Sequence, residues 1–274
     1  MDKEYIKKLA EDPRFIPGVY NYCDRWCERC PLTSRCLNYE LSEEQFDDPQ
    51  ARDIKNDAFW QKLHEVFQVT LEMVKESAKE HGIDLDSLDL QAAAEENKKT
   101  NDIAKNHECC RAAKAYSEVA KNWFDSNENL FKEKADDLIL QARLELPDSD
   151  PEQEATSLKD TVDIIRWYQH FIYVKLLRAV RGNAEEGSPN LDEFPKDSDG
   201  SAKIALIAID RSIAAWGQMS KHFPEHKDVI LDIMVHLSRI RRKTESLFPD
   251  ARAFIRPGFD DLESVTDGNP QQIT

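Results

Sequence analysis

Apolar side chains recur at intervals of three and four residues along most of the chain, and this spacing predicts helices rather than strands. The clearest stripe runs from Phe59 to Ala78 and is expected to face a core. Glycine is scarce, with 8 residues. The predicted helices cover about residues 53–81, 92–124, 127–146, 157–180, 201–222 and 225–247. We therefore expect an all-α protein.

Capping residues and helix breakers set the expected boundaries. Pro147 and Pro249 end the third and the last helix. Ser157 and Asp160 have the spacing of a capping box, which predicts that the fourth helix begins at Ser157. The segment from Arg181 to Gly200 combines Gly, Asn, Ser and Pro with several acids, and this composition predicts a long surface loop.

The order and lengths of these elements predict an antiparallel bundle of five to six helices over residues 49–248. A small cysteine-cluster module over residues 1–48 precedes the bundle, and an anchoring segment with a loose tail, residues 249–274, follows it. The helix predicted over 201–222 is apolar on every side, so we expect it at the centre of the bundle.

The overall charge narrows the classes of partner. The chain has 53 Asp and Glu against 37 Lys and Arg, a formal net charge of -16, and a polyanion of this kind repels the phosphate backbone of nucleic acids. The first fifteen residues lack the apolar region of a secretory signal, and no apolar run reaches the roughly 18 residues of a membrane helix. We expect a cytoplasmic protein, away from membranes and nucleic acid, whose partner is another protein; a homo-oligomer also fits the sequence.

Four cysteines near the N-terminus provide the strongest chemical motif. They are Cys23, Cys27, Cys30 and Cys36, with the spacing C-x3-C-x2-C-x5-C. Four thiolates within fourteen residues are able to converge on one soft or borderline cation, so we expect one metal centre here. We favour zinc, because a closed four-thiolate zinc site needs no assembly machinery. The alternative is a 4Fe-4S cluster, since the spacing is compact and Cys30 is followed by proline.

Arg25, Arg29 and Arg35 lie among these cysteines, and we expect them to offset the negative charge of the thiolates. A second thiol pair, Cys109 and Cys110, follows His107 but is flanked by alanines. This pattern favours tight helix packing, with cysteine as a small apolar residue, over a second chemical site.

Polar residues on apolar helix faces suggest a second candidate site. Asp210 interrupts the most apolar helix, and Asp163, His170 and His236 occupy apolar faces of two other helices. These four residues are the catalytic candidates of a carboxylate–histidine cluster that would bind a metal or transfer protons. The simpler interpretation, which we favour, is a network of ion pairs and hydrogen bonds that fixes helix register.

Taken together, the sequence predicts a metal-stabilised binding or adaptor protein, most simply one with zinc at the four cysteines. An iron–sulfur redox protein is the first alternative, and an enzyme that uses the Asp/His cluster is the second. The sequence therefore leaves open whether the protein is an enzyme.

Overall fold

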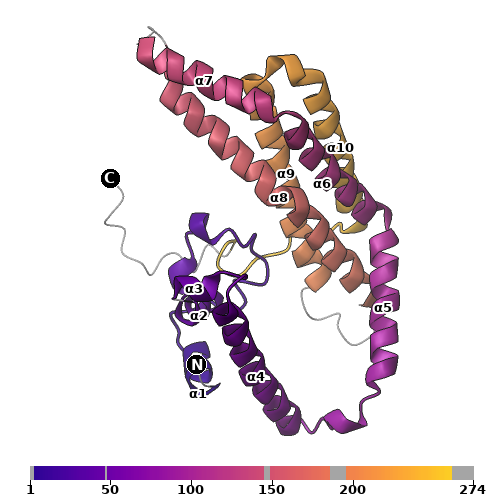
Figure 1. The fold of residues 1–274 in the computed structure, drawn as a ribbon. Coiled ribbons are helices and arrows are strands. Elements are labelled where there is room, and N and C mark those ends of the chain that lie inside the picture. Colours follow the sequence, from indigo (N-terminus) through magenta and orange to yellow (C-terminus); the bar gives the residue numbers. More distant parts are fainter. Residues whose placement is uncertain (1–2, 47, 145–148, 186–195, 261–274) are drawn as a thin grey trace. The chain divides into compact units, whose positions relative to one another are not determined.

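The computed structural model describes residues 3–46, 48–144, 149–185 and 196–260 of the chain (Figure 1). Within these ranges every regular element is a helix and no strand occurs, which confirms the all-α prediction. None of the described helices combines the length and the apolar character needed to cross a lipid bilayer.

The chain consists of two compact units. Residues 1–95 and 255–274 form the first unit and residues 96–254 form the second, so the second unit is inserted into the first. The division falls within helix α5 (Leu90–Asn106). The three-part division expected from the sequence stays a prediction about which parts fold independently.

The first unit consists of short elements around one long helix. Ion pairs join its first helix to the long one: Lys7 Nζ lies 3.1 Å from a carboxylate oxygen of Glu76, and Lys3 bonds the other oxygen. In chain order the elements are α1 (Lys3–Ala10), the 3-10 turns η1 (Cys27–Arg29) and η2 (Thr33–Arg35), α2 (Leu37–Gln45), α3 (Pro49–Arg52), α4 (Asp57–Glu80) and the turn η3 (Leu85–Ser87).

This unit has a small apolar core. Trp60 and Phe67 of α4 are 54% and 63% exposed, so the prediction that the whole stripe of this helix faces a core was wrong. The reason is length, because α1 and α2, with 8 and 9 residues, are too short to cover a helix of 24 residues. The buried apolar residues of the unit, among those described, are Phe15, Val19, Ala51 and Ala78.

The second unit contains all the other buried apolar residues among those described. Its helices are α6 (Glu108–Ser126), α7 (Glu128–Leu144), α8 (Pro151–Glu185), α9 (Asp197–His222) and α10 (Lys227–Leu247), with the turn η4 (Pro224–His226) before the last. In Figure 1, α6, α8, α9 and α10 run side by side, whereas α7 lies along the first part of α8.

Helix α9 is the central helix of this unit, as the sequence predicted. It packs against both α8 and α10, and Ile204, Leu206, Ile209 and Trp216 are fully or almost fully buried. Contacts at both ends show that α8 and α9 are antiparallel. Near one end, Gly182 of α8 meets Ser198 of α9. At the other, Ser157 Oγ lies 3.3 Å from His222 Nε2.

Two helix boundaries differ from the predicted ones. The helix expected over 92–124 is two helices, α5 and α6, because the chain leaves helical geometry at His107, whose Nδ1 accepts a hydrogen bond from the Cys109 N–H at 3.2 Å. The fourth predicted helix begins at Pro151 instead of Ser157. Asp150 Oδ1 accepts from the Gln153 N–H at 2.9 Å there, so an Asp cap with Pro at the first position starts the helix earlier.

The expected loop between residues 181 and 200 is shorter at both ends. Helix α8 continues to Glu185 and α9 begins at Asp197, while residues 186–195 lie outside the described part. Two acids of the segment, Asp197 and Asp199, lie in the first turn of α9, where negative charge favours the helix N-terminus.

Candidate metal centre

Two tight turns place three of the four cysteines. Cys27 begins the 3-10 turn η1, and Cys30 ends it by donating its N–H to the Cys27 carbonyl at 3.1 Å. Cys36 ends the second turn and is the residue before α2, where its carbonyl accepts the N–H groups of Tyr39 and Glu40, each at 3.1 Å. The position of the fourth cysteine therefore also fixes where α2 begins.

The sulfur atoms make local contacts with the backbone. Cys30 Sγ accepts the N–H of Leu32 at 3.4 Å, a contact that favours the thiolate. The Cys23 thiol donates to the Tyr20 carbonyl at 3.5 Å. All four cysteines are free thiols of intermediate burial, so they are accessible without being fully solvated.

The four thiols influence one another electrostatically. Burial raises the pKa of Cys27, and negative charge on Cys23, Cys30 and Cys36 raises it further. Burial also raises the pKa of Cys30, with the Leu32 N–H acting in the opposite direction. Each of the other three cysteines thus lies within electrostatic range of Cys27, and bringing four thiolates together requires a cation to balance them.

The thiols are not arranged as a closed ligand shell. Over the ranges that the structure describes, no three or more His, Cys, Asp or Glu side chains form a group able to hold a metal ion. The donor set still fits a soft or borderline cation, because it consists of four thiols, three of them on two short turns, with a backbone N–H directed at one sulfur. The metal centre therefore stays a prediction.

Backbone strain marks the first part of this segment. Arg25, between the first two cysteines, has φ of 60°, a conformation that costs a non-glycine residue about 1–2 kcal/mol. Asp24 Oδ1 accepts the Trp26 N–H at 3.2 Å across this turn. The Arg29 guanidinium lies 4.0 Å from the centre of the Trp26 ring. Of the three arginines expected to offset thiolate charge, Arg29 therefore has a stacking role.

Residues 255–260 belong to the same unit and pack on the cysteine segment. Gly258 approaches Ile16 and Leu32 so closely that an added Cβ would lie 2.8 Å from Ile16 Cδ1. A bidentate ion pair between Arg256 and Asp260, with the nearest nitrogen and oxygen 2.8 Å apart, closes this short segment. The segment thus covers the side chains that flank the cysteines.

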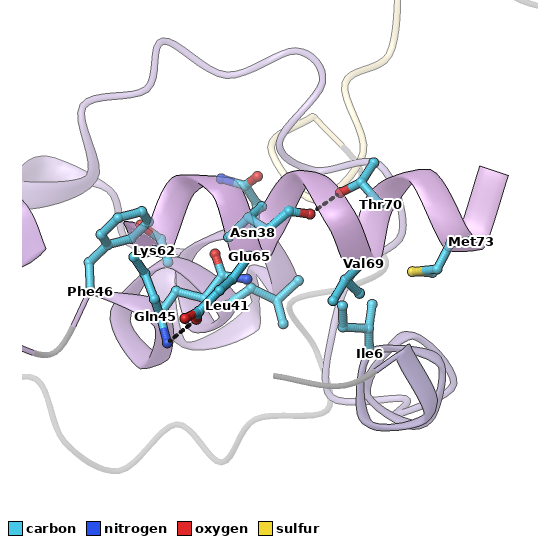
Figure 2. Close-up of a pocket in the computed structure, with 12 residues that line it drawn as sticks. Ile6, Asn38, Leu41, Gln45, Phe46, Lys62, Glu65, Val69, Thr70 and Met73 are labelled. Atoms are coloured by element: carbon cyan, nitrogen blue, oxygen red, sulfur yellow. Dashed lines mark hydrogen bonds and ion pairs between the residues drawn. The ribbon is translucent and has the colours of Figure 1, made fainter. Parts of the chain in front are cut away.

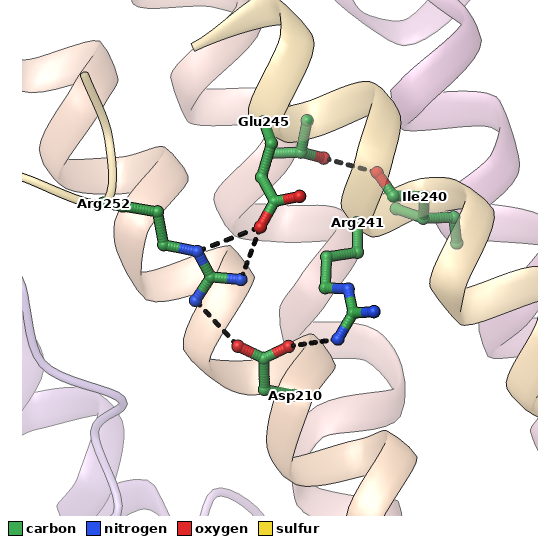
Figure 3. A network of polar contacts seen from close by, with 6 residues as sticks. Asp210, Ile240, Arg241, Glu245 and Arg252 are labelled. Carbon is green, nitrogen blue, oxygen red and sulfur yellow. Dashed lines mark hydrogen bonds and ion pairs between the residues drawn. The ribbon is translucent and has the colours of Figure 1, made fainter. Parts of the chain in front are cut away.

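Asp210 is not an interior carboxylate. Its side chain is 37% exposed and binds two arginines, Arg241 at 3.2 Å and Arg252 at 2.7 Å. Arg252 also holds Glu245 with two nitrogens, at 2.8 and 3.1 Å (Figure 3). These contacts join α9, α10 and the segment after α10, which agrees with the interpretation of Asp210 as part of a structural network.

The other three candidates have separate surroundings. Asp163 binds Lys159 one turn earlier on α8, at 2.8 Å. His170 is exposed and its ring lies 5.7 Å from that of Tyr173. The His236 ring donates Nε2–H to the Ala112 carbonyl at 2.9 Å, a bond that joins α10 to α6. None of these contacts brings two of the four predicted catalytic residues together.

The second cysteine pair packs in the core, as predicted. Cys109 and Cys110 are 1% and 0% exposed. Burial raises the pKa of Cys109 to about 11 and that of Cys110 to about 12. Both thiols are therefore protonated at neutral pH, which makes them poor nucleophiles and poor metal ligands.

A pocket that the sequence did not predict lies between α1, α2 and α4 (Figure 2). Its volume is about 380 Å³, in the range of small-molecule sites. Lys62 and Glu65 form an ion pair on its α4 side, at 3.4 Å. Its lining combines Ile6, Leu41, Phe46, Val66, Val69 and Met73 with Asn38, Ser42, Gln45 and Thr70. The face of α4 that borders this pocket contains Val66, Val69 and Met73. These residues form a second apolar stripe, which the sequence analysis missed because the stripe from Phe59 to Ala78 is richer in aromatic residues.

Comparison with known proteins finds no match: no protein-family model, curated protein or solved structure is similar to this chain. The site must therefore be interpreted from its own residues.

Proposed function

We propose that Cys23, Cys27, Cys30 and Cys36 bind one metal ion, with zinc favoured, and that this ion holds the first unit in its folded form. The observation that carries the proposal is the combination of a very small apolar core with four free thiols, three of them on two tight turns, in the same unit. On this view the protein is a metal-stabilised binding or adaptor protein.

The apolar core of the first unit provides little stabilisation. Units with few buried apolar side chains generally need a disulfide, a metal or a partner to fold. The described cysteines form no disulfide. A structural zinc ion contributes folding free energy directly, with apparent values of about 10–16 kcal/mol in small zinc-binding peptides. An ion at the four cysteines would supply what the core of this unit lacks.

The same ion would also shape the pocket of the first unit. Helix α2 begins directly after Cys36 and contributes Asn38, Leu41 and Gln45 to the pocket lining. An ion bound at Cys36 would fix the start of α2 and therefore one wall of the pocket. This link between the ion and a cavity favours a binding role over a purely structural one.

The experiment is elemental analysis and a visible spectrum of protein purified without oxygen. We expect about one zinc per chain and no colour, because zinc has a filled d shell. The variant Cys27→Ser/Cys30→Ser should lose the metal and become sensitive to protease within residues 15–45. The matched control is Cys110→Ala, which removes a buried thiol outside the proposed site and should keep full metal content.

The same measurement separates the alternatives. Iron with sulfide and a brown colour would assign an iron–sulfur cluster to these cysteines. Absence of metal in protein from every preparation, with the first unit still folded, would refute the proposal. A catalytic role for Asp163, His170, Asp210 and His236 is not favoured, since each has a different set of partners.

A further inference from the structure

An apolar groove lies between α7 and the first part of α8, in the second unit. Its volume is about 450 Å³. Leu138 at its base is 6% exposed, whereas Ile139 beside it is 51% exposed. The apolar lining consists of Phe131, Ala135, Leu138, Ile139, Ala142, Pro151, Ala155, Leu158 and Val162.

The two helices of the groove form a hairpin, and none of the other described helices of the second unit packs on its open side. Phe131, near the start of α7, contacts the rings of Trp123, Phe124 and Phe223 in the core of the unit. Beyond this anchor, α7 packs mainly against α8, and the hairpin extends away from α6, α9 and α10 in Figure 1. Two helices with an uncovered apolar face are half of a four-helix bundle.

The charges at the groove suit a second copy of the same hairpin. Glu152 and Lys159 are the charged residues of the lining. On α8, Glu152 lies three residues before Ala155 and Lys159 lies four residues after it. If two α8 helices pack antiparallel about a two-fold axis beside Ala155, Lys159 of each copy lies opposite Glu152 of the other. Lys159 is available for this contact, because its bond to Asp163 is a surface pair and its side chain is 78% exposed.

Small residues would let two hairpins approach closely. Ala135 and Ala142 of α7 and Ala155 of α8 all line the groove. With 17 residues α7 is about 25 Å long, and two packed helices are about 20 Å wide, so each copy would cover roughly 500 Å². Two copies together would bury about 1,000 Å², the lower limit of a specific interface.

We propose that this groove is the interface of a symmetric homodimer, in which two α7–α8 hairpins form a four-helix bundle with reciprocal Glu152–Lys159 pairs. The interface is isologous, as in most soluble dimers. Its area is at the low end of specific interfaces, so the dimer should be weak and reversible.

Sedimentation of the full-length protein between about 1 and 300 µM tests the interface, because a weak dimer with a small interface associates only as the protein concentration rises. Ile139→Asp should weaken association about 100-fold, since the new charge would be buried among apolar side chains. The matched control is Leu140→Asp. Leu140 is the next residue, equally apolar and 53% exposed, but it does not line the groove. Its variant should associate within about twofold of the parent protein.

Charge reversal tests the two-fold symmetry directly. Glu152→Lys or Lys159→Glu alone would place like charges opposite one another twice in each dimer, and each should weaken association about 5- to 10-fold. The double variant Glu152→Lys/Lys159→Glu restores both pairs in reversed order and should recover association to within about twofold.

The remaining outcomes overturn the proposal. A protein that stays monomeric over the whole concentration range has no such interface. If Ile139→Asp lowers the thermal midpoint of such a monomer, part of the same chain covers the groove. A dimer that Ile139→Asp leaves intact uses another surface. A monomer that instead binds a designed amphipathic helical peptide through Ile139 uses the groove for a different partner.

Discussion

Gly258 offers the sharpest test of how the first unit is built, because two separate penalties apply to a side chain there. Its φ is +75°, and a Cβ would lie 2.8 Å from Ile16 Cδ1 and 3.4 Å from Leu32 Cδ1. We therefore expect Gly258→Ala to release residues 255–260 from the side chains that flank the cysteines.

The magnitude follows from these two penalties. Left-handed backbone costs a non-glycine residue about 1–2 kcal/mol, and forcing an extra methyl group into a filled space costs about 1–3 kcal/mol. The local opening free energy should fall by about 2–5 kcal/mol in total. Gly82 provides the matched control, because it has φ of +68° and nothing within 4 Å of the added Cβ. Gly82→Ala should therefore cost only the strain, about 1–2 kcal/mol.

Hydrogen exchange measures both effects locally. The amide of Asp260 donates to the Arg256 carbonyl at 3.1 Å, and that of Ile83 donates to the Ala78 carbonyl at 2.8 Å. Each reports on its neighbouring glycine. Both substitutions should speed up exchange of their reporter amide. The increase at Asp260 in Gly258→Ala should be about 5- to 150-fold larger than the increase at Ile83 in Gly82→Ala, because the steric penalty adds about 1–3 kcal/mol at Gly258.

A second substitution tests the cause. Ile16→Val removes Cδ1, the atom nearest to the added Cβ, so the double variant Gly258→Ala/Ile16→Val should recover part of the lost protection. Equal effects of the two glycine substitutions, with no recovery in the double variant, would show that Gly258 does not pack on Ile16.

Three further predictions concern other parts of the chain. Asp210→Ala should lower the free energy of unfolding by about 1 kcal/mol, because its partners Arg241 and Arg252 are 37% and 43% exposed and ion pairs at such positions are weak. Urea unfolding should show a smaller loss of stability at high salt. A loss that salt does not change would contradict an electrostatic origin. Folding keeps the thiols of Cys109 and Cys110 protonated up to about pH 11, whereas the unfolded chain ionises near the ordinary pKa of 9.0, so the free energy of unfolding should fall as pH rises above about 9. The variant Cys109→Ala/Cys110→Ala should show a shallower fall, and identical profiles would refute this assignment. If the proposed metal centre is correct, a chelator should increase proteolysis within residues 15–45 and leave 96–254 protected, and uniform sensitivity along the chain would count against a local site.

The parts of the fold that the sequence predicted well are those where one physical effect dominates. Helix α9 is apolar on every side, and only a central position buries such a surface. The thiols of Cys109 and Cys110 were expected in the core from the alanines around them, and they are buried there.

The predictions that failed have a different cause, because each of these features depends on which other elements pack beside it. The α4 stripe is apolar, but helices long enough to cover it are absent among the described elements of its unit, so Trp60 and Phe67 stay exposed. Helix α6 begins at a histidine cap, a role that residue preferences seldom assign to His. Asp210 looked buried because its neighbours in sequence are apolar, yet Arg241 and Arg252 come from elements that follow it in the chain.

The cysteine segment is intermediate between these cases. Spacing alone identified four thiols, and negative charge on the neighbouring cysteines helps to raise the pKa of Cys27 and of Cys30. The turns η1 and η2 that carry them, and the packing of Gly258 beside them, could not be predicted because they depend on backbone hydrogen bonds and on a segment far away in sequence.

The insertion of the second unit into the first has a consequence for biosynthesis. A ribosome that has just completed Cys36 must still add the whole of residues 96–254 before Gly258 exists to pack against Ile16. At roughly 5–20 residues per second this interval is on the order of ten to forty seconds. During that time the nascent chain offers its four thiols while Ile16 and Leu32 still lack their contact with Gly258, so metal delivery and oxidation compete for the thiols before the polypeptide is released.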